Sequence, residues 1–518
     1  MQIFFLRNII NLNDNKGVNM ELKFGTAGVR GIIGSGNMNM NKTTVQKVSF
    51  ALAKVILEKG NEDKKCVIGY DNRNMSLEFA EVAGSVFEFF GIKTFIFEDI
   101  SPTPLVSYAI RKMKCDFGVM ITASHNPKEY NGYKAYDSTG CQILPTFADK
   151  VQSESHTWEY EHENPIEIKE LEKVPQKIIN SYLKRILKTV GPQAKPTIKI
   201  AYSPLHGTGY KIVPKLLKTL GYEFYEDKTQ NFKSISFENT KSCNPEHALA
   251  FEGVKKVGQQ NKTDLIMVTD PDADRVGVGV LKDGEYILLD GNETGTIVFD
   301  FLAKRIKEVK LKKEWYMLYS FVSTDLPKAI ARKHNINVIE LATGFKWIGN
   351  FANKIEAEGN KFLFGFEESY GSLYTSKIGR DKDAIQSIVL IAKIADFYKK
   401  QGKTLLDVYE EIQKEHYFTK MKMNPIKIKP EITFSISELM KKARKIKGVK
   451  EIVDFNNKEA EEVKGNMIKI MFEDESWIAV RPSGTEPIIK VYINAKSKDK
   501  NDLLKRFNEI QNISKKLI

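Results

Sequence analysis

The chain has 518 residues and a formal net charge of +13, and at about 100 to 200 residues per domain this length predicts three or four domains. The basic charge is typical of nucleic-acid binding, but the lysines are spread along the whole chain, without any RNP, zinc-finger or basic-region pattern. No stretch is apolar over a membrane-spanning length, so we expect neither nucleic acid nor a membrane as a partner.

The start of the chain carries an apolar patch, MQIFFLRNIINL, which is too short and too interrupted for a signal peptide. We expect residues 1–19 to be poorly tied to the remainder, with Met20 as a candidate true start. The four cysteines show no CxxC spacing, which favours a reduced, cytoplasmic setting.

From Cys66 onward, short apolar runs alternate with amphipathic stretches. The runs CVIGY, KTFIFE and DFGVMITAS are typical of strands, and the stretches between them, SLEFAEVAGSVFEFFG and PLVSYAIRKM, are typical of helices. This order predicts a parallel sheet with helices on its faces. With a polar segment and a helix to about residue 187, it forms a predicted first domain, residues 20–190.

The same pattern restarts twice after the linker VGPQAKP. The runs TIKIAYS and LIMVT, with a helix through residue 220, predict a second α/β domain, residues 191–305. A third, residues 306–415, is predicted by EWYMLYSFVS, NVIELATGFKW and KFLFGFEESYG, closed by the helix DAIQSIVLIAKIADFYKK. A helix, paired antiparallel strands in MIKIMFEDESWIAVRPSGTEPIIKVYINA and a final amphipathic helix predict an α+β domain, residues 416–518.

Ser124, Asp270 and Glu367 each follow the end of a predicted strand, in three different domains. Ligands of open α/β sheets bind outside the carboxyl ends of the strands. We therefore expect one site at the junction of these domains.

Asp270, Asp272 and Asp274 are spaced two apart in TDPDADR, directly after a buried strand. Three carboxylates on a tight loop are hard oxygen ligands, and Mg²⁺ suits a site that phosphate completes. A calcium loop of the EF-hand type is excluded, because Arg275 stands where Gly is needed and Leu281 where Glu is needed. A solvated acidic turn is the alternative, against which the mutual repulsion of the charges argues.

Ser124 lies in GVMITASHNP, where a turn or helix-cap serine would be the ordinary interpretation. Beside a metal and basic groups, however, a serine hydroxyl can carry a phosphoryl group. Lys134, ten residues further along, and His125 are candidates for a proton shuttle or a cation, and a purely structural role for His125 is equally open.

Three further loops contain polar groups suited to a sugar phosphate. RPSGTEP offers donors for a phosphate, although it also fits a hairpin turn. GFEESYG places Glu367 and Ser369 two apart for gripping sugar hydroxyls, with a helix-capping box as the alternative. FGTAGVRG is a Gly-rich turn with one arginine, Arg30. Only 12 of the 79 basic residues are arginines, and four of them lie in the motifs named here or in GRDKDA, which favours a small phosphorylated ligand.

Together, TASHNP, DPDADR, GFEESYG and RPSGTEP, in this order, resemble the motifs of the α-D-phosphohexomutase superfamily. The resemblance extends from about residue 22 to the C-terminus. It implies an α/β fold class, with three mixed α/β sheet domains plus a C-terminal α+β domain around a central cleft.

The resemblance also implies that Ser124 is phosphorylated and passes its phosphoryl group to a sugar monophosphate. The resulting bisphosphate turns round and returns its other phosphate to the serine. Mg²⁺ would be held by Asp270, Asp272, Asp274 and Ser124, while Arg275 and Lys134 match basic positions beside the transferring group. The implied substrate-binding residues are Arg30, Thr343, Gly344, Lys346, Glu367, Ser369, Arg380, Lys382, Arg481, Ser483, Gly484 and Thr485.

The stretches TGFKW and EESYG are similar to those of the phosphoglucomutase and phosphopentomutase branch. Mannose- and glucosamine-preferring branches usually have a His where this chain has Gly371, which leaves Lys134 and His125 as candidate general acid/base groups. The implied function is interconversion of glucose 1-phosphate and glucose 6-phosphate, with glucose 1,6-bisphosphate as activator. A phosphopentomutase, a phosphomannomutase and a sugar-bisphosphate synthase are alternatives, as is a non-catalytic basic nucleic-acid-binding protein. The expected partner is a small sugar phosphate, and the expected state a monomer or homodimer.

Overall fold

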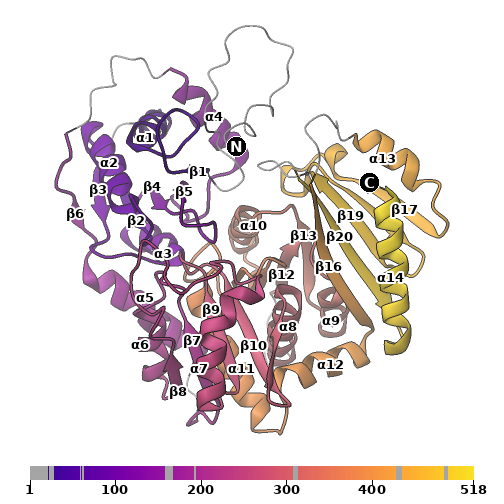
Figure 1. The fold of residues 1–518 in the computed structure, drawn as a ribbon. Coiled ribbons are helices and arrows are strands. Elements are labelled where there is room, and N and C mark those ends of the chain that lie inside the picture. Colours follow the sequence, from indigo (N-terminus) through magenta and orange to yellow (C-terminus); the bar gives the residue numbers. More distant parts are fainter. Residues whose placement is uncertain are drawn as a thin grey trace, which may run out of the picture.

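The computed structural model describes residues 22, 28–58, 60, 63–157, 167–191, 194–306, 313–427, 435–482 and 488–517. Its four β-sheets are each formed by one continuous part of the chain. Figure 1 shows the four units following one another in an arc, from the indigo and purple N-terminal unit to the yellow C-terminal unit. The predicted fold class, three mixed α/β units and a C-terminal α+β unit, is confirmed.

The first sheet has the strand order β1-β5-β4-β2-β3-β6, in which only β5 runs antiparallel to its neighbours β1 and β4. Its strands are β1 (Val29–Ile32), β2 (Lys65–Tyr70), β3 (Lys93–Ile96), β4 (Phe117–Ile121), β5 (Tyr130–Asp137) and β6 (Glu172–Lys173). Alternate residues of β2 face opposite sides: Cys66 and Ile68 pack against one helical layer and Val67 against the other. The first layer is α1 (Lys42–Leu57), α2 (Ser76–Phe89) and α4 (Pro145–Ser155); the second is α3 (Thr103–Met113) and α5 (Gln176–Val190).

The second sheet, β11-β10-β9-β7-β8, is parallel at β9-β7-β8 and antiparallel at β11-β10-β9. Its strands are β7 (Lys199–Ser203), β8 (Glu223–Glu226), β9 (Leu265–Thr269), β10 (Val276–Lys282) and β11 (Glu285–Leu289). The aspartate motif forms the turn between β9 and β10. One face packs against α7 (Glu252–Asn261), and the other against α6 (Ile212–Thr219).

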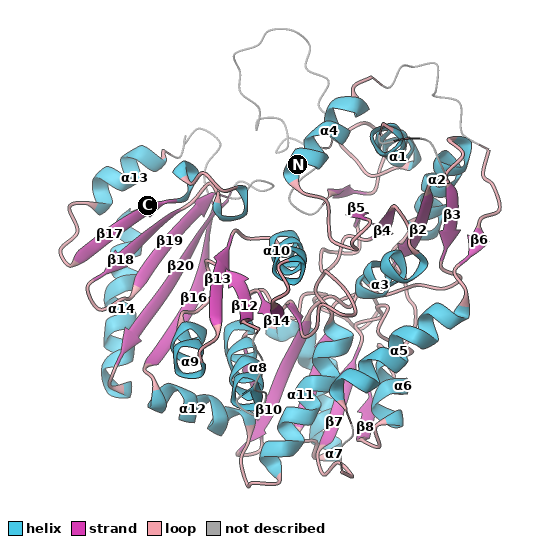
Figure 2. Cartoon of the chain, turned by 180° about the vertical axis from the view of Figure 1, so that it is seen from behind, coloured by secondary structure: helices cyan, strands magenta, loops and turns pink. Residues whose placement is uncertain are grey.

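The third sheet, β13-β12-β14-β15, comprises β12 (Trp315–Ser320), β13 (Asn337–Leu341), β14 (Lys361–Phe366) and β15 (Ser372–Leu373). The accompanying helices are α8 (Gly291–Ile306), α9 (Leu326–His334), α10 (Phe345–Ala357), α11 (Ala384–Lys399) and α12 (Leu405–Glu415). The predicted long apolar helix is α11. It contacts α5 of the first unit, α6 and β10 of the second, and α8, α12 and β15 of the third. Figure 2 shows this helix beside β10. One helix therefore ties three units into one core.

The fourth sheet, β16-β20-β19-β18-β17, is antiparallel throughout. Its strands are β16 (Phe418–Lys427), β17 (Val449–Asp454), β18 (Ile468–Phe472), β19 (Trp477–Pro482) and β20 (Ile488–Ser497). One face packs against α13 (Ile436–Ala443) and α14 (Lys500–Leu517). From the other face, Trp477, Ala479 and Tyr492 pack into the third unit, so the C-terminal sheet is docked through a shared apolar core.

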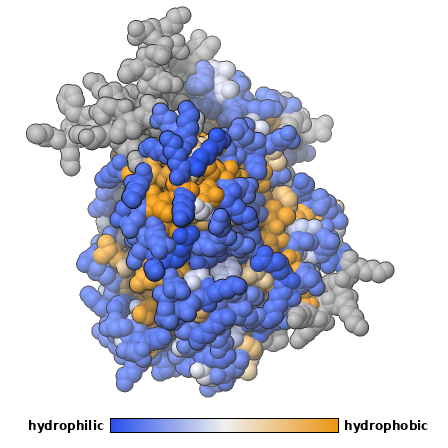
Figure 3. Space-filling view, turned by 90° about the vertical axis from the view of Figure 1, so that its right-hand side faces the viewer, coloured by the Kyte–Doolittle hydropathy of each residue, from blue (hydrophilic) through white to orange (hydrophobic). Residues whose placement is uncertain are grey.

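The surface is mostly hydrophilic, and the thiols lie inside the fold. On the side where the C-terminal unit lies, hydrophilic residues cover most of the face and apolar residues gather in a patch among them (Figure 3). All four cysteines are buried free thiols. Across the described ranges, we find no helix with the length and apolar character that crossing a bilayer requires.

Candidate active site

Ser124 stands just past the end of β4, at the carboxyl edge of the first sheet. Its backbone has a φ of +52°, a left-handed conformation that is uncommon for a residue with a side chain. The buried hydroxyl lies 2.9 Å from Oδ2 of Asp270, which belongs to the second unit, and 3.3 Å from Nδ1 of His125. The structure thus brings together the predicted hydroxyl and the predicted carboxylate from different units.

The three aspartates of the β9–β10 turn are fully buried, and one carboxylate oxygen from each lies within 4.8 Å of the others. Oδ1 of Asp272 and Oδ1 of Asp274 have no hydrogen-bond partner among the described residues. A buried carboxylate oxygen without a partner is unfavourable, and divalent cations bind such oxygens. The donor set, all hard oxygens, fits Mg²⁺, with Ser124 Oγ beside it.

Two lysines share the other oxygens of these carboxylates. Lys134 on β5 donates to Oδ2 of Asp272 at 2.7 Å and to Oδ2 of Asp274 at 3.0 Å, and Lys382 lies 3.1 Å from the same Asp274 oxygen. Burial alone would lower the pKa of Lys134, but Asp272 and Asp274 outweigh it and raise the pKa. Thr103 completes the cluster, donating its hydroxyl to Asp272 at 2.7 Å.

Two predicted arginines lie beside this cluster of charged groups. Nη1 of Arg275 is 2.6 Å from a carboxylate oxygen of Glu246, and its Nε is 4.0 Å from Asp274. Arg30 donates from Nη1 to the side chain of Asn126, in the serine loop, at 2.7 Å. Burial, followed by the charges of Arg275 and Arg30, holds the pKa of His125 well below its usual value, so its imidazole is neutral.

The GFEESYG loop lies directly against the aspartate loop. Gly371 forms a β-bridge with Arg275, and the backbone N–H of Val276 donates to the carbonyl of Tyr370 at 3.2 Å. The carboxylate of Glu367 accepts the backbone N–H of Gly344 at 2.7 Å, which joins this loop to the start of α10. The predicted Glu367 and Gly344 are therefore in contact, and Thr343 and Ser369 lie in the same two loops.

Gly371 has no side chain, and the side chain of Lys382 fills the space beside it. A Cβ at Gly371 would lie 2.1 Å from Cδ of Lys382. The missing side chain therefore lets Lys382 reach Asp274.

Other predicted substrate-binding residues have contacts of their own. Arg380 is buried and pairs with Glu356 at 2.5 Å and with Asn353 at 2.5 Å, both on α10, so its contact with a sugar phosphate stays a prediction. Lys346 is buried with its ammonium 5.5 Å from the centre of the Trp347 ring, and burial lowers its pKa.

The predicted phosphate site in the C-terminal unit is the RPSGTEP loop, of which the structure describes Arg481 and Pro482. Arg481 lies at the end of β19, opposite Lys490 of β20. Burial first, and then the charge of Glu368 across the domain junction, raise the pKa of the nearby Tyr492. The predicted residues Ser483, Gly484 and Thr485 lie outside the described part of the chain.

Several residues of this site were not predicted from the sequence, and all of them but Asp381, in GRDKDA, lie outside the motifs named there. Arg73 and Asp71 follow β2 and contact the serine loop. Glu246 pairs with Arg275. Asp381 accepts hydrogen bonds from Tyr136 at 2.9 Å and Gln142 at 2.7 Å, beneath Lys134. The available signal was position, because Asp71 and Arg73 follow the carboxyl end of a strand of the same sheet as Ser124.

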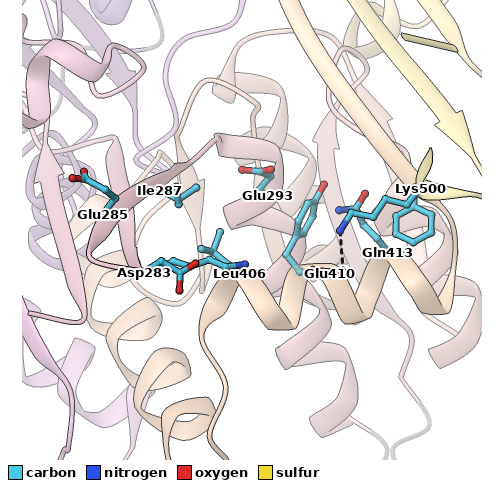
Figure 4. A pocket seen from close by; sticks show the side chains of 11 residues that line it. Asp283, Glu285, Ile287, Glu293, Leu406, Glu410, Gln413 and Lys500 are labelled. Atoms are coloured by element: carbon cyan, nitrogen blue, oxygen red, sulfur yellow. Dashed lines mark hydrogen bonds and ion pairs between the residues drawn. The ribbon is translucent and has the colours of Figure 1, made fainter. Parts of the chain in front are cut away.

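A separate cavity of about 570 Å³ lies between the β10–β11 hairpin, α8, α12 and the start of α14 (Figure 4). Its lining includes Glu293, Tyr409 and the ion pair between Lys500 and Glu410, whose atoms are 3.0 Å apart. None of the predicted site residues lines it. This cavity is therefore distinct from the serine and aspartate site.

Comparison with known families accounts for nearly the whole chain. The models of phosphoglucomutase/phosphomannomutase α/β/α domains I, II and III match residues 21–162, 180–284 and 290–416, and the model of the C-terminal domain matches residues 434–509. Fold and site together thus define an isomerase of the phosphohexomutase type. The chain belongs to the phosphoglucomutase/phosphomannomutase family, within the α-D-phosphohexomutase superfamily.

Individual relatives agree with this assignment. A phosphoglucomutase of Staphylococcus aureus is 33% identical over 96% of this chain and 94% of its own length. Among solved structures, the Paramecium phosphoprotein parafusin, a phosphoglucomutase, matches with a TM-score of 0.72 and 17% identity over 96% of this chain and 95% of that chain. A phosphoglucomutase/phosphomannomutase family protein of Burkholderia thailandensis matches with a TM-score of 0.72 and 16% identity over 96% of this chain and 98% of that chain. These two structures share the fold.

Proposed function

We propose that the protein is a phosphoglucomutase that interconverts glucose 1-phosphate and glucose 6-phosphate through a phosphoserine at Ser124. The observation that carries this proposal is the 2.9 Å contact between Ser124 Oγ and Asp270, which joins a hydroxyl and a carboxylate cluster from two units. Relatives 33% identical over 96% of the chain are phosphoglucomutases, which supports glucose as the sugar.

In the proposed cycle, the C6 hydroxyl of glucose 1-phosphate attacks the phosphorus of phosphorylated Ser124. The bond from phosphorus to the serine oxygen breaks, the hydroxyl proton passes to a base, and the serine oxygen takes up a proton. The product, glucose 1,6-bisphosphate, turns round, and the serine oxygen then takes the phosphoryl group from C1 and leaves glucose 6-phosphate. His125, whose Nδ1 is 3.3 Å from the serine oxygen, and Lys134 are the two candidates for moving these protons.

Asp270, Asp272, Asp274 and the phosphorylated Ser124 would hold Mg²⁺. An ion bound there would neutralise negative charge on the phosphoryl group during transfer. Lys134, Lys382 and Arg275 lie beside the carboxylates of Asp272 and Asp274 and supply fixed positive charge from the protein itself.

The remaining residues are proposed to bind and orient the substrate, a small sugar phosphate, with glucose 1,6-bisphosphate as activator. Glu367 and Ser369 would hold sugar hydroxyls, and Arg481, Ser483, Gly484 and Thr485 the phosphate that is not reacting. Arg30, Thr343, Gly344, Lys346, Arg380 and Lys382 complete the proposed set. Because a free sugar phosphate is the proposed substrate, we also propose a cytoplasmic location.

Intact mass tests the serine directly. We expect the chain to gain one phosphoryl group on incubation with glucose 1,6-bisphosphate and to lose it on addition of glucose 1-phosphate. Ser124→Ala should gain none and show no turnover, whereas the control Ser437→Ala, at an exposed serine of α13, should behave like the parent. Measurable turnover by Ser124→Ala would reject the serine as the phosphoryl carrier.

The choice of sugar needs its own measurement, because few contacts separate the family's substrates. We expect kcat/KM for glucose 1-phosphate to exceed that for mannose 1-phosphate and ribose 1-phosphate when the three compete. A preference for the pentose or for mannose would replace the glucose assignment while leaving the phosphoserine mechanism in place.

A further inference from the structure

One buried arginine, Arg73, forms hydrogen bonds with the backbone of the loop that carries Ser124. Arg73 donates from Nη2 to the carbonyls of Ser124 at 2.6 Å and Asn126 at 2.5 Å. Its Nη1 donates to the carbonyls of Pro127 at 2.7 Å and Tyr130 at 3.1 Å. A single guanidinium thus binds four carbonyl oxygens, three in the turn between β4 and β5 and one at the first residue of β5.

The guanidinium is itself fixed by its surroundings. Its side chain is fully buried and forms an ion pair of 3.2 Å with Asp71, which is also fully buried. On the side of the second unit, the centre of the Phe237 ring lies 5.4 Å from the guanidinium carbon. The neighbouring Asn72 donates to the carbonyl of Ser234 at 2.7 Å. Arg73 therefore sits where the serine loop meets the unit that supplies the aspartates.

Asp71 is also linked to Ser124 through the hydroxyl of Thr122. One carboxylate oxygen accepts the hydroxyl of Thr122 at 2.6 Å, and that hydroxyl accepts the backbone N–H of Ser124 at 2.8 Å. Both the N–H and the carbonyl of Ser124 are thus held by one Asp71–Arg73 pair. A left-handed conformation is unfavourable for a residue with a side chain and persists only where its surroundings enforce it.

From these contacts we infer that Arg73, acting with Asp71 and Thr122, is a positioning residue that holds the Ser124 hydroxyl against Asp270. The inference rests on the proposed function, because it assigns Arg73 a role in phosphoryl transfer to and from that serine. Arginine is required because its planar fork presents several N–H donors at fixed angles. A lysine keeps the charge but has three donors on one flexible nitrogen.

The test compares the parent with Arg73→Lys and Thr122→Val. The rate at which Ser124 gains a phosphoryl group from glucose 1,6-bisphosphate is measured by intact mass, alongside kcat, KM and the thermal midpoint. We expect Arg73→Lys to slow phosphoryl uptake and kcat by about 10²-fold, because small misplacements of a reacting group cost this much, with KM changed less than about threefold. Thr122→Val should slow the same two rates by about tenfold. The matched control is Arg506→Lys. Arg506 lies on α14 and pairs with Asp474 at the surface, so this variant should leave both rates unchanged.

The outcomes separate the inference from the proposed function. If the parent takes up a phosphoryl group and a folded Arg73→Lys takes it up equally fast, Arg73 is not a positioning residue. If the activity of Arg73→Lys falls only in proportion to its folded fraction, its role is structural and the inference is overturned. If Arg73→Lys does not fold, Thr122→Val decides, and uptake at the parent rate overturns the inference. If the parent itself gains no phosphoryl group, the proposed function falls and the inference falls with it.

Discussion

At the residue scale, Asp272 and Asp274 each direct one carboxylate oxygen to a lysine and keep Oδ1 without a hydrogen-bond partner among the described residues. Such a buried oxygen costs about 1 to 3 kcal/mol, which a bound cation offsets. We therefore expect EDTA to abolish turnover and Mg²⁺ to restore it. The thermal midpoint should rise with Mg²⁺ concentration, since an ion that binds only the folded chain stabilises it. Full turnover after thorough chelation would remove the three aspartates from the mechanism.

Gly371 allows a second test, because its missing side chain makes room for Lys382. In Gly371→Ala the added methyl would lie 2.1 Å from Cδ of Lys382, so this side chain must shift, and we expect the shift to move the ammonium away from its position 3.1 Å from Asp274. We expect kcat/KM to fall by about tenfold or more, consistent with loss of a fixed charge beside the transferring group. Gly379→Ala is the control, since there the nearest atom to the new Cβ is 3.4 Å away.

The same glycine permits a double-variant cycle. If Gly371→Ala acts by displacing Lys382, adding it to Lys382→Ala should change kcat/KM little further, because the displaced group is already absent. Fully additive losses would show that the alanine harms the site by another route, such as the β-bridge to Arg275.

Sequence reasoning identified residues that lie in distinctive motifs. It missed residues whose contacts are made to backbone atoms. Ser124 and the three aspartates were predictable because a dense run of carboxylates after a buried strand is rare without a cation. Arg73 was not, because YDNRNM resembles an ordinary turn. Its partners are four backbone carbonyls. Every residue has a carbonyl, so the sequence does not indicate which of them will accept a hydrogen bond.

At the scale of elements, Asp290 and Glu293 cap the start of α8 by accepting each other's backbone N–H, and the pKa of Glu293 is raised. Glu293 accepts the N–H of Asp290 at 2.9 Å, and Asp290 accepts the N–H of Glu293 at 2.8 Å. Burial, and then the charge of Asp290, raise the pKa of Glu293 to about 8. Because this exceeds the value in the unfolded chain, about 4.3, the folded chain binds the extra proton between these pH values. The resulting stability is complete below the lower value and is lost as pH rises through the upper one.

Glu293→Gln keeps an oxygen acceptor for the Asp290 N–H and removes the charge. We expect its thermal midpoint to exceed that of the parent by roughly 2 °C or more at pH 9, since about 1 kcal/mol shifts a large domain by this amount. The two midpoints should converge at pH 5, where the glutamate is protonated. A gap that is equal at both pH values would mean that the glutamate does not titrate in this window.

The predicted elements that the structure contains are those in which apolar residues recur with a clear periodicity. The long helix closing the third unit is α11, and the paired C-terminal strands are β18, β19 and β20. Several strands were missed, and β5 and β16 show why. Strand β5 contains Asn, Lys and Asp and follows a turn, although all but its two end residues are buried. Strand β16 is an edge strand that alternates lysine with apolar residues, and Pro425 interrupts its pattern. Edge position and burial depend on neighbours, which a local pattern does not contain.

At the scale of the whole molecule, the units are joined by packing that crosses their predicted boundaries. Helix α8 packs against α9 and α12, which accompany the third sheet. We therefore propose that the third domain begins with α8, earlier than the boundary after residue 305 predicted from the sequence. A sequence gives the order of elements along the chain, whereas a boundary is set by which apolar face each helix buries.

The C-terminal unit is joined to the third by a buried polar contact. Trp477 on β19 donates its indole N–H to Asp325, just before α9, at 2.7 Å. Burial alone would raise the pKa of Asp325, but the charges of Lys469, Lys328 and Lys496 outweigh it and lower the pKa, so the carboxylate is ionised. The same strand ends beside Arg481, which we propose to bind the non-reacting phosphate.

This arrangement predicts what happens when the indole is replaced by a phenyl ring. Trp477→Phe leaves a buried carboxylate short of one donor, at a cost of about 1 to 3 kcal/mol, leaves part of the indole volume unfilled, and loosens the far end of β19. Contacts to a phosphate that does not react contribute equally to ground and transition states, so their loss raises KM rather than lowering kcat. We expect KM for glucose 1-phosphate to rise roughly three- to tenfold, with kcat within about twofold. Trp315→Phe, on β12, is the control and should leave KM unchanged. A lower thermal midpoint with unchanged KM in Trp477→Phe would mean that this contact stabilises the junction without orienting the phosphate site.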